Sequence, residues 1–188
     1  MPFYVHAKDK PGVGAELDKL VEEHWSYMDR FDERLILRGP TLSDDGEEHT
    51  GSVHIVDLDD RAAADRFGDE EPFWQAGLYE DITTERAAVL LDREPSAASR
   101  SGEAPNALLV GRWEPKPHNA PTLGADTDAR LDFVALLVDD DQSHTIGFVA
   151  VVTAMPDEAE AIARPLADRF AGEAVPLAVT RWCRGGRR

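Results

Sequence analysis

A stretch of small and polar residues, punctuated by proline and glycine, divides the chain near its middle. Residues 94–105 read EPSAASRSGEAP in one-letter code and lack the apolar periodicity of a helix or a strand. This composition is typical of a linker between folded units. With 188 residues in all, the chain has room for two small domains. We therefore expect one domain over residues 1–92, a linker over 93–105 and a second domain over 106–188.

The first half carries strand and helix signals in the order strand, helix, strand, strand, helix, strand. The predicted strands cover residues 3–8, 35–38 and 52–58, and a last strand begins near 78. The dipeptide Gly39-Pro40 is expected to end the second strand. A long helix is predicted over 15–31 and a short one over 60–67. Along the long helix an inward stripe recurs at spacings of three and four residues: Leu17, Leu20, Val21, His24, Met28 and Phe31.

The second half repeats the strand pattern but not the first helix. Strands are predicted over residues 107–113, 133–138, 148–154 and 175–182, and a helix opens with Pro156 in its first turn. The segment 114–121 stands where the first half has its long helix. Its three prolines are incompatible with a helix interior. The second half is therefore interpreted as a degenerate copy of the first.

Two hairpins echo each other along the chain. Arg34-Leu35 begins a strand whose partner returns at 49–53, and Arg130-Leu131 begins one whose partner returns at 144–149. Each hairpin leads to a helix that contains the tripeptide DRF. An internal duplication explains this echo. The alternative is that any two hairpins of this fold look alike.

This order of elements predicts an α+β fold class with two ferredoxin-like βαββαβ halves. Such a half has helices on one side of its sheet only. The other face needs a cover, because it would otherwise expose an apolar patch. Packing the two halves sheet to sheet covers both faces within one chain. We expect a monomer with pseudo-dimeric halves, or alternatively a homodimer.

The net charge of the chain limits the classes of molecule that it can bind. The formal net charge is −17 at pH 7, and the pI is near 4.6. This field repels phosphate backbones and anionic lipid heads, so we expect a small-molecule ligand, no nucleic acid and no membrane. The single cysteine, Cys183, excludes an internal disulfide. A cytoplasmic location follows as the simplest expectation, since no apolar run has the length of a membrane span and no leader pattern opens the chain.

His24 is the residue that is best suited to a catalytic role. It lies in the middle of the inward stripe, titrates near neutrality and could shuttle a proton. A buried imidazole without a partner would cost about 1–3 kcal/mol. A carboxylate would fix its tautomer, and Asp32, Asp69 and Glu71 are the local candidates. The alternative is a core histidine that bonds to backbone groups.

Other constellations carry little signal. The remaining histidines, at positions 6, 49, 54, 118 and 144, lack the spacing of metal ligands, so no metal is expected. The run Asp139-Asp140-Asp141 has no calcium-loop sequence around it and is expected to form a hairpin turn. No glycine-rich nucleotide-binding motif occurs.

Several short motifs in the first half stand in one characteristic order. They are AKDKPG at 7–12, HWSYM at 24–28, GP at 39–40 and EPFWQAGLYE at 71–80. In order and spacing this half resembles the YCII-related family. The resemblance implies the dimeric α/β-barrel group, whose ferredoxin-like units pair through their sheets and whose relatives include enzymes without metal or flavin. It also implies a centre in which a histidine, here His24, pairs with a carboxylate. The family commonly has Asp where this chain has Glu71.

Together these features favour a small cofactor-independent enzyme. His24 would act as general acid and base on a small organic molecule, in an isomerisation, a lyase reaction or an elimination, and Glu71 or Asp32 would orient it. Substrate contacts are expected from Tyr27, Arg38, Phe73 and Trp74, although core packing or a surface charge also explains each of them. The alternative is a non-catalytic module that binds a ligand or regulates a partner. No equivalent centre is expected in the second half.

Overall fold

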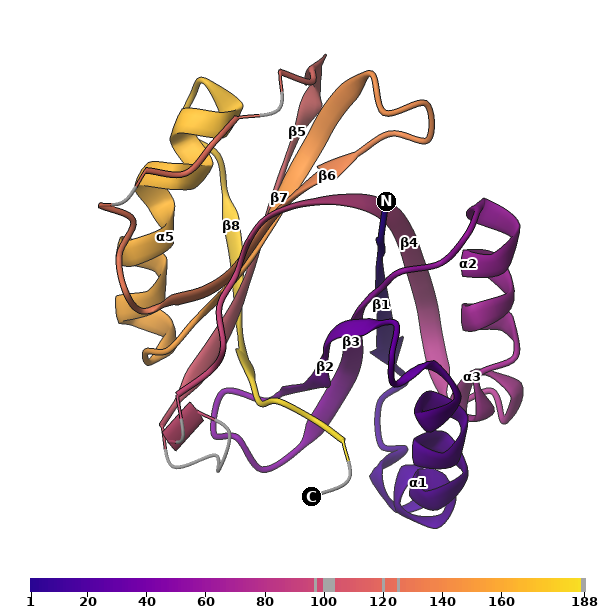
Figure 1. Ribbon diagram of the computed structural model, residues 1–188. Coiled ribbons are helices and arrows are strands. Elements are labelled where there is room, and N and C mark those ends of the chain that lie inside the picture. The colour runs from indigo at the N-terminus through magenta and orange to yellow at the C-terminus, as the bar shows by residue number, and fades with distance from the viewer. Residues whose placement is uncertain (97, 100–103, 120, 125, 187–188) are drawn as a thin grey trace. The chain divides into compact units, whose positions relative to one another are not determined.

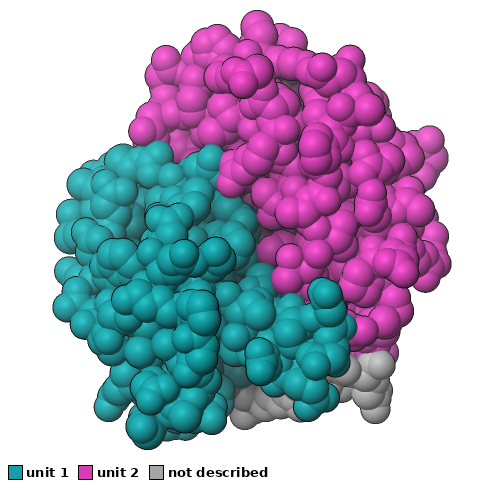
Figure 2. Space-filling view, turned by 180° about the vertical axis from the view of Figure 1, so that it is seen from behind, with its two compact units in different colours: residues 1–85, 184–188 teal, residues 86–183 magenta. Residues whose placement is uncertain are grey.

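The computed structural model of the protein describes residues 1–96, 98–99, 104–119, 121–124 and 126–186. They form two compact units (Figure 1, Figure 2). Unit 1 contains residues 1–85 and the C-terminal residues from Arg184 onwards, and unit 2 contains residues 86–183. The expected linker falls in part on residues 97 and 100–103, which lie outside the described residues.

Unit 1 has the expected ferredoxin-like order of strands and helices. Its elements are β1 (Phe3–Asp9), α1 (Gly14–Met28), the 3-10 turn η1 (Asp29–Phe31), β2 (Leu35–Leu42), β3 (His49–Val56), α2 (Arg61–Asp69), α3 (Pro72–Gln75) and the first part of β4 (Tyr79–Asp92). The strand order within the unit is β4–β1–β3–β2, with antiparallel pairing of β1 and β2 to β3. This is the order that a βαββαβ chain gives when both helices cross on the same side.

The helices cover one face of the unit 1 sheet. Phe3 and Val5 on β1 and Val56 on β3 form a buried cluster with Tyr27 and Met28 of α1 and with residues of α2. Residues that lie opposite each other on paired strands share a face. Since Val5 pairs with His54 and His54 pairs with Arg38, these two polar residues lie on the helix-covered face as well.

One strand boundary differs from the sequence prediction. β2 does not end at Gly39-Pro40 but continues to Leu42, and Pro40 pairs with Ser52 of β3. A proline lacks the N–H that a ladder bond needs, yet the register of β2 against β3 runs from Leu37 through Pro40 to Thr41 without a shift.

The described residues of unit 2 include four further strands and the helix α5. They are β5 (Asn106–Pro117), β6 (Leu131–Val138), β7 (His144–Val152), α5 (Pro156–Ala171) and β8 (Leu177–Trp182). The order is β8–β5–β7–β6, and residues 86–92 of β4 pair with β6. Between β5 and β6 no helix is found among residues 118–119, 121–124 and 126–130. The unit is therefore a ferredoxin-like half without its first helix, as the prolines predict, and not a full βαββαβ unit.

The α+β fold class is confirmed, with eight antiparallel strands and few helices in the described residues. The internal duplication and the sheet-to-sheet packing of the halves stay predictions. No helix among the described residues is long and apolar enough to cross a membrane.

Helix α5 lies against its sheet through a stripe of alanines. Ala159, Ala163, Ala167 and Ala171 are fully buried and belong to the core cluster of unit 2. Their short side chains let the helix backbone approach the strands closely, and such interiors have few voids. The helix ends at Gly172, whose φ of 70° is the left-handed conformation that glycine adopts without strain.

We predict that Ala163→Leu destabilises the protein by about 1–3 kcal/mol, because the added side chain has no room between helix and sheet. The matched control is Ala161→Leu, two residues away on the exposed face, which should change the free energy of unfolding by less than about 0.5 kcal/mol. Urea unfolding followed by circular dichroism measures both. Equal effects of the two substitutions would contradict the close packing of α5.

Candidate functional site

A hydrogen bond between two buried side chains joins helix α1 to the residue that caps α3. His24 Nδ1 lies 2.6 Å from Glu71 Oε1. The His24 side chain is 11% exposed and that of Glu71 is 4% exposed, so little water reaches either partner. His24 comes from α1 and Glu71 from the segment before α3, 47 residues further along the chain.

Local sequence explains why Glu71 is held in place. Glu71 is the N-cap of α3, and Pro72 follows at the first helical position, where a missing N–H costs nothing. The second carboxylate oxygen, Oε2, accepts a hydrogen bond of 2.9 Å from the backbone N–H of Trp74. Both oxygens of the carboxylate thus have a partner. The geometry fixes the side chain in the orientation that meets His24.

Aromatic rings fix the imidazole from the sides. The ring of Phe73 stacks on His24 with centroids 4.5 Å apart and an angle of 5° between the planes. Phe73 in turn meets the edge of Tyr79. An imidazole held by a stack and a hydrogen bond has little freedom to rotate. Its other nitrogen, Nε2, has no hydrogen-bond partner in the described part of the chain.

His54 is a site residue that the sequence prediction missed. Its ring centroid lies 6.2 Å from that of His24, and it meets the edge of Phe67. The residue is buried, and its ring makes no hydrogen bond to another described residue. Burial, together with the neighbouring His24, Arg38 and His6, holds the pKa of His54 well below its usual 6.5. His54 is therefore a neutral imidazole next to the His24–Glu71 pair.

Asp32 lies elsewhere. Its exposed side chain is 3.6 Å from Arg38, and Asp29 contacts the same guanidinium group from 3.6 Å. The carboxylate beside His24 is thus Glu71 and not Asp32. Arg38 is mostly buried between these two acids, so its charge is compensated, and an anionic ligand would have to compete with both.

Among the described residues, neither Tyr27 nor Trp74 makes a hydrogen bond to the His24 ring. The hydroxyl of Tyr27 donates to the carbonyl of Phe67 over 3.0 Å. Burial, followed in size by the charge of Glu70, raises the pKa of Tyr27 to about 12. Trp74 is half-buried and contributes its backbone N–H to Glu71. Their expected role as substrate contacts stays a prediction.

A surface hollow of about 520 Å³ lies between α1 and the segment that leads to α3. Its lining includes Glu23, Tyr27 and Arg30 of α1 and Glu70 and Pro72 on the other side. His24 and Glu71 are not among its lining residues. The hollow thus lies next to the pair rather than over it.

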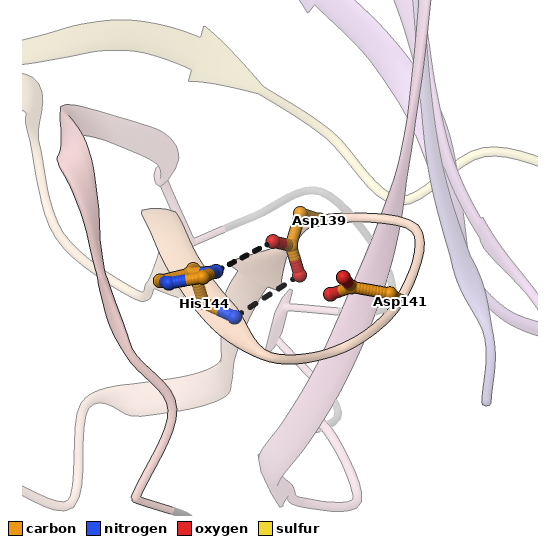
Figure 3. A group of neighbouring side chains, drawn as sticks. All are labelled: Asp139, Asp141 and His144. Carbon is orange, nitrogen blue, oxygen red and sulfur yellow. Dashed lines mark hydrogen bonds and ion pairs between the residues drawn. The ribbon is translucent and has the colours of Figure 1, made fainter.

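In unit 2 a second group of polar side chains gathers at the turn between β6 and β7 (Figure 3). Asp139, Asp141 and His144 each offer a ligand atom within 4.8 Å of the others. Both oxygens of Asp139 accept hydrogen bonds from His144, from its backbone N–H and from Nδ1. The backbone bond contributes most to holding the pKa of Asp139 at about 2. These contacts are those of the expected hairpin turn, and they explain the grouping without a ligand.

We predict that Glu71→Ala lowers the free energy of unfolding by about 2–4 kcal/mol, because it removes the α3 cap and leaves His24 buried without a partner. Asp32→Ala is the matched control and should cost less than about 0.5 kcal/mol, since its ion pair is exposed. Chemical unfolding measures both variants. A larger effect at Asp32 would contradict the assignment of Glu71 as the partner.

His54 should make stability depend on pH. In the unfolded chain its imidazole takes up a proton below pH 6.5, whereas in the folded protein the lowered pKa keeps it neutral. The free energy of unfolding therefore falls as the pH drops below 6.5, and His54→Leu lacks this contribution. Relative to the variant, the wild-type protein should lose up to about 1.4 kcal/mol per pH unit in urea unfolding at decreasing pH. Parallel pH curves would contradict the assignment of a neutral His54.

Comparison with known proteins agrees with this fold. A family model described as the YCII-related domain matches residues 1–86. No curated protein matches the chain. One similar solved structure is the 5-chloro-2-hydroxyhydroquinone dehydrochlorinase of Burkholderia phenoliruptrix AC1100, in complex with 2,5-dihydroxybenzoquinone. It is 28% identical over 46% of this chain and 92% of that protein, with a TM-score of 0.43.

Two further structures cover nearly the whole chain. A candidate monooxygenase from Lactobacillus acidophilus NCFM is 11% identical over 97% of this chain and 93% of that protein, with a TM-score of 0.57. A second candidate monooxygenase, from Fusobacterium nucleatum, is 9% identical over 97% of this chain and 91% of that protein, with a TM-score of 0.56. At these identities the likeness shows the fold alone, an α+β fold with an eight-stranded antiparallel sheet that is consistent with two ferredoxin-like halves. Residues 1–86 are therefore similar to the YCII-related domain.

Proposed function

We propose that unit 1 is a small cofactor-independent enzyme in which His24 moves a proton on a small organic molecule. The observation that carries this proposal is the buried 2.6 Å hydrogen bond between His24 and Glu71. The YCII-related family match over the same residues supports it. Isomerisation, lyase reactions and eliminations are the reaction classes that such a centre serves.

The chemistry follows from the tautomer that Glu71 selects. As an ionised carboxylate, Glu71 accepts a hydrogen bond from the Nδ1–H group of His24. The proton of the neutral imidazole is therefore on Nδ1, and the lone pair is on Nε2. Nε2 then takes a proton from a carbon or oxygen of the substrate. The positive charge that forms on the ring is stabilised by Glu71 across the short bond. In an isomerisation the same nitrogen returns the proton to another atom of the substrate.

The surrounding residues suit a centre that does not reorganise during the reaction. The Phe73 stack holds the ring plane, and the Trp74 N–H holds the carboxylate. Preorganised groups of this kind gain most of their effect from being fixed before the reaction begins. His54, as a neutral imidazole nearby, adds a second polar group that can accept or donate a hydrogen bond.

A non-catalytic ligand-binding module is the alternative function. The low exposure of both partners favours it, because a structural histidine pair would be buried in the same way. The two functions differ in whether a bound molecule exchanges protons at Nε2.

We predict that the protein catalyses deuterium uptake from D2O into at least one member of a panel of lactones and aromatic acids. His24→Gln should slow that exchange by about 10²–10⁴-fold, because general acid–base catalysis contributes this much. NMR spectroscopy measures the loss of the proton signal of the compound without requiring knowledge of the product. The matched control is His118→Gln, a histidine of unit 2 that should leave the rate unchanged.

Two results would contradict the proposal that unit 1 is an enzyme. Exchange at the wild-type rate in His24→Gln would remove His24 from the mechanism. Binding of panel compounds without any exchange would identify unit 1 as a ligand-binding module.

A further inference from the structure

A second hydrogen-bonded array of polar side chains lies in unit 1, apart from the His24–Glu71 pair. We propose that Asp9, His49 and Ser52 form a catalytic triad that transfers acyl groups from small esters to the Ser52 hydroxyl. Asp9 is the last residue of β1, His49 is the first residue of β3, and Ser52 follows three positions later. The antiparallel pairing of β1 and β3 brings the three together.

The distances match the roles of a triad. His49 Nδ1 lies 2.5 Å from Asp9 Oδ2, and His49 Nε2 lies 3.5 Å from Ser52 Oγ. The Asp9 carboxylate accepts a hydrogen bond from the Nδ1–H group of His49. The lone pair of the neutral ring is therefore on Nε2, where it can accept the proton of the Ser52 hydroxyl. A nucleophile beside a base that a third group orients is the signature of covalent catalysis. The distance between nucleophile and base is often longer before substrate binds.

The burial of Asp9 goes beyond what a purely structural partner of His49 would need. Its side chain is 4% exposed, and its second oxygen, Oδ1, is buried without a hydrogen-bond partner in the described residues. Burying a carboxylate oxygen in this way is costly, and native structures rarely keep such a group without a reason. In a triad the cost has a purpose, since a carboxylate that bonds only to His49 interacts more strongly with the imidazolium that forms.

Tyr79 supplies a donor beside the nucleophile. Its hydroxyl donates to Ser52 Oγ over 3.3 Å. Burial raises the pKa of Tyr79 well above 10, so the hydroxyl keeps its proton. Tyr79 is thus the donor that this structure offers to the oxyanion of a tetrahedral intermediate.

Exposure limits the size of the acyl donor. His49 is 28% exposed at the end of β3, whereas Ser52 is buried beside its cross-strand neighbours Ala7 and Pro40. The exposed side of His49 is therefore the approach that we assign to the substrate, and the burial of Ser52 restricts the proposal to esters with a short acyl chain, such as acetyl. Long-chain esters and peptides are excluded as substrates.

The step balances without a further reactant. The Ser52 oxygen forms a bond to the carbonyl carbon of the ester while His49 Nε2 takes the hydroxyl proton. The carbon–oxygen bond to the alcohol then breaks, and the proton passes from His49 to the leaving alcohol. Water, deprotonated by His49, releases the acid and restores Ser52. Neither His24 nor Glu71 takes part, so this proposal does not depend on the function proposed above.

Methanesulfonyl fluoride is a small probe that tests the proposal without a known substrate. We expect it to sulfonylate Ser52 with release of fluoride, which intact-mass and peptide mass spectrometry detect. His49→Gln and Asp9→Asn should each slow the labelling by about 10²-fold or more, because they remove the base or its tautomer. Hydrolysis of 4-nitrophenyl acetate should fall in parallel. Ser143→Ala, at the hairpin of unit 2, is the control that should label at the wild-type rate.

Circular dichroism of each variant distinguishes the loss of the triad from the loss of the fold. If either His49→Gln or Asp9→Asn fails to fold, the other variant still tests the proposal. Ser52 unlabelled in the folded wild-type protein would overturn the proposal. Labelling of Ser52 at an unchanged rate in folded His49→Gln would overturn it as well.

Discussion

The hydrogen bond between His24 and Glu71 is the interaction on which the helical side of unit 1 depends. It joins the middle of α1 to the cap of α3, and both side chains are nearly excluded from water. Two buried polar groups of this kind stabilise a fold only when they find each other, because either one alone leaves an unsatisfied partner. This contact, together with the buried cluster that contains Leu17 and Phe73, holds α3 and the Phe73 ring against the imidazole.

The face of the unit 1 sheet beneath these helices is unusual because it carries polar side chains. His54 and Ser52 both lie on this face of β3, where a ferredoxin-like half normally buries apolar residues. The ring of His54 lies close to that of His24, and the hydroxyl of Ser52 lies close to the ring of His49. Polar groups in a core cost stability, and their concentration on one sheet face is the reason why we propose this face as the functional side of the unit.

Helix periodicity was sufficient to predict that His24 points inward, and the sequence offered Glu71 as one of several candidate partners. The choice against Asp32 was not predictable, since the turn after α1 decides that its side chain meets Arg38. His54 escaped prediction because residues 51–56 of β3 are all buried, so alternation does not separate the two faces. The Asp9–His49 contact spans 40 residues and depends on strand register, which the sequence does not specify. Proline content, by contrast, correctly predicted that the described residues between β5 and β6 contain no helix.

The coupling between His24 and Glu71 is the quantity that tests this account most directly. A double-mutant cycle with His24→Phe, Glu71→Gln and the double variant measures it from the free energies of unfolding. The account predicts a coupling energy of about 1–3 kcal/mol, as for buried groups in direct contact. Additive effects, with a coupling below about 0.5 kcal/mol, would show that the two side chains do not form the interaction on which the site is built.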